Sequence, residues 1–172
     1  MSNTNGLEIE RKFLIVRPSE EVLAGIPGAY KHDIEQIYLP SGVRIRKRVC
    51  GGKTEYFYTV KQRISDVTRV EHEHLISEDE YRTLASKAGD DPAAISKTRW
   101  CLPCGEHVAE VDIYAFWQRV AVVEVELAHE DEAFELPDAL TVLREVTGEK
   151  SYLNKTMAYE IQKNGYVKEP EI

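Results

Sequence analysis

The fold of this protein is decided by the stretch Leu7-Glu8-Ile9-Glu10-Arg11-Lys12-Phe13-Leu14-Ile15-Val16. Alternate side chains of a β-strand face the same way, so Glu8, Glu10 and Lys12 share one face. A face that turned two carboxylates into a protein would leave like charges crowded and desolvated. A divalent cation on the glutamates, with phosphate oxygens on the lysine, would neutralise it. The alternative is an edge strand with a solvated charged face, and the rest of the chain decides between the two.

The composition is typical of one globular domain of ordinary size. The chain has 172 residues, 42% hydrophobic and 30% charged, and we expect a single domain over residues 1–172 with a core from about 7 to 160. The net charge of −8 argues against nucleic acid or an anionic membrane as a partner. No run approaches the roughly 18 apolar residues of a membrane span, and residues 1–6 lack the layout of a secretion signal. We therefore expect a cytoplasmic protein.

Three cysteines, Cys50, Cys101 and Cys104, are too few and too odd in number for a disulfide framework. Cys101 and Cys104 have the CxxC spacing of zinc ligands, but a structural zinc site needs a second ligand pair. The sequence Pro103-Cys104-Gly105 is typical of a tight turn between two strands. A metal or redox role is therefore the weaker interpretation.

Alternating and helical patterns divide the chain into strands and a few helices. Beyond the first strand, we expect strands at residues 33–39, 43–49, 54–61, 69–76, 95–102, 107–114 and 119–127. We expect helices just after Pro18 and over residues 78–88, 137–146 and 154–164. Ser77 and Glu80 form a capping box, Gly148 ends the helix over 137–146, and Asn154 caps the last helix.

Charges recur on one face of strand after strand. Arg44 and Arg46 flank Ile45, and Glu124 and Glu126 flank Val125. This pattern predicts a mainly β protein with external helices (α+β), an eight-stranded antiparallel closed β-barrel with a charged lumen. A sheet with one solvated face would also alternate. The acids and bases segregate onto different strands, however, whereas a solvated face mixes the two signs, so the barrel is favoured.

The inward charges form two large sets. The candidate bases are Lys12, Arg44, Arg46, Lys61, Arg69, Lys97 and Arg99, and the candidate acids are Glu8, Glu10, Glu71, Glu73, Asp112, Glu124 and Glu126. A chain of phosphates matches so many bases, because arginine forks and lysines both bind phosphate oxygens. The carboxylates suit Mg²⁺ or Mn²⁺, which bridge carboxylate and phosphate oxygens. Together the two sets predict a metal-dependent polyphosphate site.

Several motifs along the chain resemble one family. They are Glu8-Ile9-Glu10-Arg11-Lys12-Phe13-Leu14, Gln36-Ile37-Tyr38-Leu39, Arg44-Ile45-Arg46, Thr59-Val60-Lys61, Arg69-Val70-Glu71-His72-Glu73, Lys97-Thr98-Arg99, Glu110-Val111-Asp112, Val123-Glu124-Val125-Glu126 and Lys150-Ser151-Tyr152-Leu153-Asn154-Lys155. The first is similar to the Glu-x-Glu-x-Lys signature of the CYTH superfamily, the triphosphate tunnel metalloenzymes. The resemblance covers roughly residues 7–160 and is closest to the bacterial tripolyphosphatase branch.

The resemblance implies a role for each motif. Glu8, Glu10 and Glu126 would hold a metal, and Glu71, Glu73, Asp112 and Glu124 would serve a second metal and the attacking water. The phosphate ligands would be Arg44, Arg46, Lys61, Lys97 and Arg99, with Arg69 and Lys150 as further candidates. Lys12 would lie beside Tyr38, a pair linked in similar bacterial members to cleavage of inorganic triphosphate. Other cations would lower the pKa of Lys12 and nearby carboxylates would raise it, so phosphate binding is its expected role.

The expected reaction is hydrolysis of inorganic triphosphate to pyrophosphate and phosphate. An organic triphosphate, such as a nucleotide or thiamine triphosphate, would need a ring platform at one end of the tunnel. Class IV-type adenylyl cyclases share the tunnel and metals, so the fold does not exclude that chemistry. A non-catalytic polyphosphate binder is disfavoured because the set of acids is complete. A homodimer is compatible with external helices, although no long apolar surface stripe indicates one.

Overall fold

The computed structural model describes residues 6–172, so the first five residues, expected to carry no secretion signal, lie outside the described part. Its elements are β1 (Leu7–Val16), α1 (Glu20–Ala24), β2 (Tyr30–Tyr38), β3 (Arg44–Cys50), β4 (Lys53–Arg63), β5 (Thr68–Ile76), α2 (Glu78–Lys87), β6 (Ala93–Cys104), β7 (His107–Ile113), β8 (Val120–Leu127), β9 (Val142–Glu145), the 3₁₀ helix η1 (Lys150–Tyr152) and α3 (Asn154–Asn164). None of the described helices is long and apolar enough to cross a membrane.

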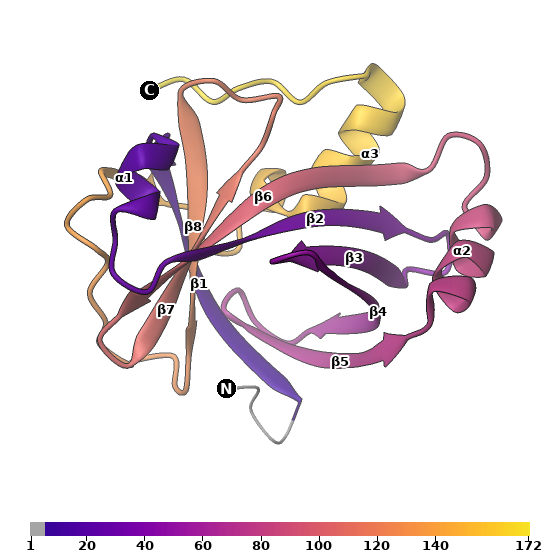
Figure 1. Cartoon of the computed structure of the whole chain (residues 1–172), viewed down its shortest axis with the longest axis horizontal. Helices are drawn as coiled ribbons and strands as arrows, with labels where there is room; N and C mark the ends of the chain where they lie inside the picture. Colours follow the sequence, from indigo (N-terminus) through magenta and orange to yellow (C-terminus); the bar gives the residue numbers. More distant parts are fainter. Residues whose placement is uncertain (1–5) are drawn as a thin grey trace.

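The strands form one antiparallel sheet that closes on itself. The strand order is β5-β4-β3-β2-β6-β7-β8-β1-β9, and a further pairing of β1 with β5 closes β1–β8 into a barrel. In the pairing of β1 with β8, Glu10 lies opposite Glu126 and Lys12 opposite Glu124. The helices lie outside the sheet (Figure 1). The predicted eight-stranded antiparallel barrel with external helices is confirmed.

The second edge of β1 is shared between two strands. Its N-terminal part pairs with β5 and its C-terminal part with β9. Between them, the backbone N–H of Glu10 donates to the carbonyl of Val67 (2.9 Å), and the N–H of Lys12 donates to Thr147 Oγ1 (2.9 Å). Two loops therefore complete the wall of the barrel at this seam.

The helix predicted over residues 137–146 is wrong. The chain there makes a turn and then the short strand Val142–Glu145 along β1. The backbone N–H of Val146 donates to the carbonyl of Lys12 at 2.8 Å. Beyond β5 the edge of β1 carries backbone groups that need partners, and this tertiary requirement outweighs local helix propensity.

One of the two predicted helix caps is present. Ser77 and Glu80 form the predicted capping box of α2. Asn154 does not cap α3, because Leu153 occupies the cap position and Asn154 Oδ1 accepts a hydrogen bond from the Tyr114 hydroxyl at 2.6 Å. The amide of Asn154 thus ties α3 to the barrel.

The turn predicted around Cys104 is present between β6 and β7. All three cysteines are free, and this turn follows Cys104 at Gly105 and Glu106. Burial raises the pKa of Cys101 to about 11, which keeps its thiol protonated at neutral pH.

Apolar side chains pack outside the barrel and also fill one end of it. On the outer face, Ile45 of β3 packs in one cluster with Tyr81 of α2. At one end the inward row of β1 turns apolar after Lys12, and Leu14 packs with Tyr38 and with Met157 of α3. The charged part of the lumen therefore ends against an apolar cluster beneath α3.

Candidate active site

The barrel encloses a cavity of about 1010 Å³. Ten lysine and arginine side chains and seven glutamates line it, all from the strands except Lys155 of α3. Of the predicted site residues, the structure brings together Glu8, Glu10, Lys12, Tyr38, Arg44, Arg46, Lys61, Arg69, Glu71, Glu73, Lys97, Arg99, Glu124 and Glu126 around this cavity. Two others lie elsewhere: Asp112 is fully buried behind the lining, and Lys150 is exposed outside it.

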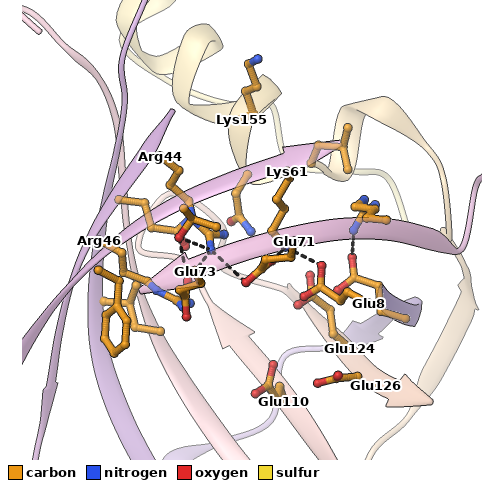
Figure 2. A pocket seen from close by; sticks show the side chains of 18 of the residues that line it. Glu8, Arg44, Arg46, Lys61, Glu71, Glu73, Glu110, Glu124, Glu126 and Lys155 are labelled. Atoms are coloured by element: carbon orange, nitrogen blue, oxygen red, sulfur yellow. Dashed lines mark hydrogen bonds and ion pairs between the residues drawn. The ribbon is translucent and has the colours of Figure 1, made fainter. Parts of the chain in front are cut away.

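Arg44 and Arg46 of β3 both pair with Glu73 on β5, and Arg44 has a longer contact with Glu71 at 3.9 Å (Figure 2). Arg46 Nη2 lies 2.7 Å and Arg44 Nη2 lies 3.1 Å from Glu73 Oε2, and the Thr59 hydroxyl donates to the same oxygen at 2.7 Å. Burial opposes the Glu73 charge, but Arg46, Thr59 and Arg44 lower the pKa of Glu73 overall. Burial and the neighbouring Arg44 lower the pKa of Arg46 to about 10. Two guanidinium groups on one carboxylate leave positive charge that an anion would neutralise.

Lys61 of β4 bridges β1 and β5. Its Nζ lies 2.7 Å from Glu8 Oε2 and 2.6 Å from Glu71 Oε2. Burial and the Arg44 guanidinium disfavour the ammonium, but Glu8 and other carboxylates raise the pKa of Lys61 above its ordinary value. Lys61 therefore stays protonated at neutral pH.

Of the predicted metal ligands, Glu8, Glu10 and Glu126 lie near one another, and cations hold Glu8 and Glu10. Glu10 faces Glu126 across β1 and β8, while Arg69 donates to Glu10 and Lys61 pairs with Glu8. Partial burial and the nearby Glu8 carboxylate raise the pKa of Glu126, a sign of crowded negative charge. Within residues 6–172, no three side chains of the ligand types converge to hold a metal ion. The carboxylates suit Mg²⁺ or Mn²⁺ by chemistry, provided that Lys61 and Arg69 move to another anion.

A continuous ion network is buried on the opposite side of the cavity. Glu124 accepts from Lys12 Nζ (2.7 Å) and Arg99 Nη2 (2.8 Å), and Arg99 Nε donates to Asp112 Oδ1 (2.7 Å). Lys97 Nζ lies 2.5 Å from Asp112 Oδ2. Burial opposes the charge of Glu124, yet Lys12 and Arg99 hold the pKa of Glu124 well below its ordinary value. Burial and the Arg99 guanidinium lower the pKa of Lys97 to about 8, although Asp112 opposes this shift.

Lys12 and Tyr38 both line the cavity, but each has another hydrogen-bond partner. Lys12 Nζ donates to the carbonyl of Tyr152 (3.1 Å), and the Tyr38 hydroxyl accepts from Gln36 Nε2 (3.1 Å). Burial disfavours the ammonium of Lys12, but Glu124 raises the pKa of Lys12. Burial raises the pKa of Tyr38 although nearby cations oppose it. Both groups therefore hold their protons and can donate to an anion.

Arg48, Glu110 and Lys155 line the cavity as well, although no site role was expected for them from the sequence. Strand periodicity contains the signal for two of them, because Arg48 continues the row of Arg46 and Glu110 shares the face of Asp112. Lys155 comes from the first turn of α3 (Figure 2). No periodic pattern reports where the end of a helix docks on a barrel.

The chain was compared with known proteins. No protein-family model matches it. It is 32% identical over 160 residues to an inorganic triphosphatase of Nitrosomonas europaea, covering 90% of this chain and 98% of that protein. It is 29% identical over 161 residues to an inorganic triphosphatase of Acetivibrio thermocellus, covering 92% of this chain and 97% of that protein. The crystal structure of the inorganic triphosphatase NE1496 is similar with a TM-score of 0.54 and 29% identity, over 88% of this chain and 93% of that one.

These similarities extend over about nine-tenths of the chain. The closed eight-stranded barrel and its charged lining agree with the motifs in the sequence. The chain belongs to the CYTH superfamily, the triphosphate tunnel enzymes that generally depend on a divalent metal.

Proposed function

We propose that this protein hydrolyses inorganic triphosphate to pyrophosphate and phosphate, with a divalent metal, inside the barrel. The observation that carries the proposal is the surplus of cations around the cavity, where ten lysine and arginine side chains face seven glutamates and where Arg44 and Arg46 both pair with Glu73. A multiply charged anion with oxygens along its length satisfies such a lining. Similarity to two inorganic triphosphatases supports the choice of substrate.

The substrate-binding residues are those cations that line the cavity. Arg44, Arg46 and Lys61 bind phosphate oxygens from one side, and Lys97 and Arg99 bind from the other. Arg69 joins them when it leaves Glu10. Positioning and charge stabilisation supply most of the acceleration of phosphoryl transfer, so the protein needs little covalent chemistry of its own.

Glu8, Glu10 and Glu126 are the residues that would hold Mg²⁺ or Mn²⁺. Glu10 and Glu126 lie opposite each other on β1 and β8, and burial together with the nearby Glu8 carboxylate raises the pKa of Glu126. When bound, such a cation would neutralise the charge that develops on the phosphate chain and would lower the pKa of a bound water.

Hydrolysis adds one water across a terminal P–O–P bridge: a new P–O bond forms, the bridging P–O bond breaks, and pyrophosphate leaves. We assign orientation of the attacking water to Glu71 and Glu73, with Glu124 as a further acceptor. Lys12 and Tyr38 act as donors to phosphate oxygens, because both retain their protons in the barrel. This matches the phosphate-binding role expected for Lys12.

The experiment that tests the proposal measures release of phosphate from inorganic triphosphate, pyrophosphate, ATP and thiamine triphosphate, with Mg²⁺ and then with Mn²⁺. We expect strong preference for inorganic triphosphate and no release without a divalent cation. Preference for ATP or thiamine triphosphate would make the protein an organic triphosphatase. Consumption of ATP with release of pyrophosphate and no free phosphate would identify a cyclase. Binding of triphosphate without any turnover would identify a polyphosphate-binding module.

A further inference from the structure

Asp112 occupies a different position from the other acids of the site. It lies on β7, is completely inaccessible to solvent, and does not line the cavity. The residues in front of it are Lys97 and Arg99 of β6, and both of these line the cavity.

Both oxygens of Asp112 are engaged with these two cations. Oδ1 accepts from Arg99 Nε at 2.7 Å, and Oδ2 accepts from Arg99 Nη2 at 2.8 Å. Oδ2 also lies 2.5 Å from Lys97 Nζ. A bidentate carboxylate fixes the plane of a guanidinium group as well as its position. Asp112 therefore fixes the Nε edge of Arg99, while Glu110 accepts from Nη1 of the same guanidinium group.

Arg99 in turn determines the position of Glu124. Arg99 Nη2 donates to Glu124 Oε2 at 2.8 Å, and Glu124 Oε1 pairs with Lys12 Nζ at 2.7 Å. The path Asp112–Arg99–Glu124–Lys12 is an unbroken series of ion pairs among buried side chains. A shift of Arg99 would be transmitted to Lys12, which we propose as a donor to phosphate.

We propose that Asp112 is a positioning residue for triphosphate hydrolysis, which holds Arg99 and Lys97 in the directions from which they bind the phosphate chain. This inference rests on the proposed function. It replaces the metal-ligand role that the resemblance implied for Asp112, because the carboxylate has no surface on the cavity. A catalytic group displaced by about 1 Å can lower the rate about a hundredfold. Loss of a residue that holds Arg99 and Lys97 in place should therefore have a large effect on activity.

The test compares Asp112→Asn, Arg99→Gln and the combined variant by calorimetric titration with inorganic triphosphate in EDTA, which removes both turnover and metal. The matched control is Asp33→Asn, an exposed aspartate of the same barrel that accepts from the Thr98 hydroxyl at 3.0 Å. We expect Asp112→Asn to weaken binding about tenfold or more and the control to bind normally. Because Asp112 acts in part through Arg99, the loss of affinity in the combined variant should be smaller than the product of the two single losses.

A second measurement separates positioning from metal ligation. The concentration of Mg²⁺ that gives half-maximal phosphate release should be the same in Asp112→Asn and in the unaltered protein, while the KM for triphosphate rises. A several-fold rise in that Mg²⁺ concentration would overturn the proposal in favour of a metal ligand. Unchanged or tighter triphosphate binding by Asp112→Asn, or losses that multiply with Arg99→Gln, would also overturn it.

Loss of a buried carboxylate leaves cations unpaired, so Asp112→Asn could fail to fold. In that case Lys97→Met is compared with Lys97→Met/Asp112→Asn, which removes one acid and one base together. Weaker triphosphate binding by the double variant supports the proposal, and equal binding overturns it. If the unaltered protein neither binds nor hydrolyses triphosphate, the proposed function fails together with this inference. If the unaltered protein binds triphosphate and the Asp112 variants bind it equally well, only the inference about Asp112 fails.

Discussion

Lys61 lies between Glu8 and Glu71, with its Nζ 2.7 Å from one carboxylate and 2.6 Å from the other. Lys61 is therefore ion-paired with Glu8, which we propose as a metal ligand. Arg69 is ion-paired in the same way with Glu10, the second proposed ligand. An ammonium and a divalent cation cannot both use the same oxygen fully. Binding of metal to Glu8 and transfer of Lys61 to a phosphate are thus thermodynamically linked.

Lys61→Met should therefore strengthen metal binding in the absence of substrate. Removing the competing ammonium leaves Glu8 free, so we expect the Kd for Mn²⁺, measured by electron paramagnetic resonance, to fall about threefold or more. The same variant should bind inorganic triphosphate more weakly, since a phosphate ligand is lost. Lys87→Met, on the exposed end of α2, serves as the control. Weaker Mn²⁺ binding by Lys61→Met would mean that the lysine orients Glu8 rather than competing for it.

Glu10→Gln should abolish turnover and leave the fold intact. The amide keeps the size of the side chain but removes a charged oxygen ligand, and Glu10 contacts the cavity rather than the apolar core. We expect phosphate release to fall at least about a hundredfold, with an unchanged circular dichroism spectrum. Glu106→Gln, at the exposed turn between β6 and β7, should retain full activity. Near-normal activity of Glu10→Gln would show that Glu10 is not a ligand of the metal.

The alkaline limb of activity should depend on Lys97. Its pKa is lowered to about 8, so its ammonium is present below that pH and is lost above it. The pH dependence of kcat/KM follows the ionisation of groups in the free enzyme. We therefore expect kcat/KM to fall as the pH rises through about 8. Lys97→Arg keeps the charge at all these pH values and should shift the fall to higher pH. Lys87→Arg, assayed under identical conditions, controls for the ionisation of the substrate, which affects both variants equally. Superimposable pH profiles for the two variants would show that Lys97 does not set the alkaline limb.

Gly148→Ala should destabilise the barrel at its seam. Gly148 has φ +76°, and a Cβ there would lie 2.8 Å from Asp66 Cβ and 2.9 Å from Asp66 Cγ. Gly105 has φ +62° and no atom within 4 Å, so Gly105→Ala measures backbone strain alone. We expect Gly105→Ala to lower the free energy of unfolding by about 1–3 kcal/mol, and Gly148→Ala to lower it by about 1–3 kcal/mol more. Urea unfolding measures both, and equal losses would show that the contact with Asp66 relaxes.

Much of the fold could be predicted because its signals are local. Alternation along residues 7–16 placed Glu8, Glu10 and Lys12 on one face, and the lining of the cavity includes all three. The capping box at Ser77 marked the start of α2 in the same way. The strand at Val142–Glu145 was missed because it forms only where the edge of β1 is free, a condition set by residues more than a hundred positions earlier.

The sequence by itself determined which side chains turn inward and that both signs of charge meet in one lumen, because the period of a strand and the chemistry of a side chain are local properties. Only the tertiary structure decided which acid meets which base. Strand register and the docking of α3 place Lys61 on Glu8, Asp112 behind Arg99 and Lys155 at the cavity, and leave Lys150 outside it. These pairings join residues far apart in the chain, so they depend on how the barrel closes rather than on any pattern within one strand.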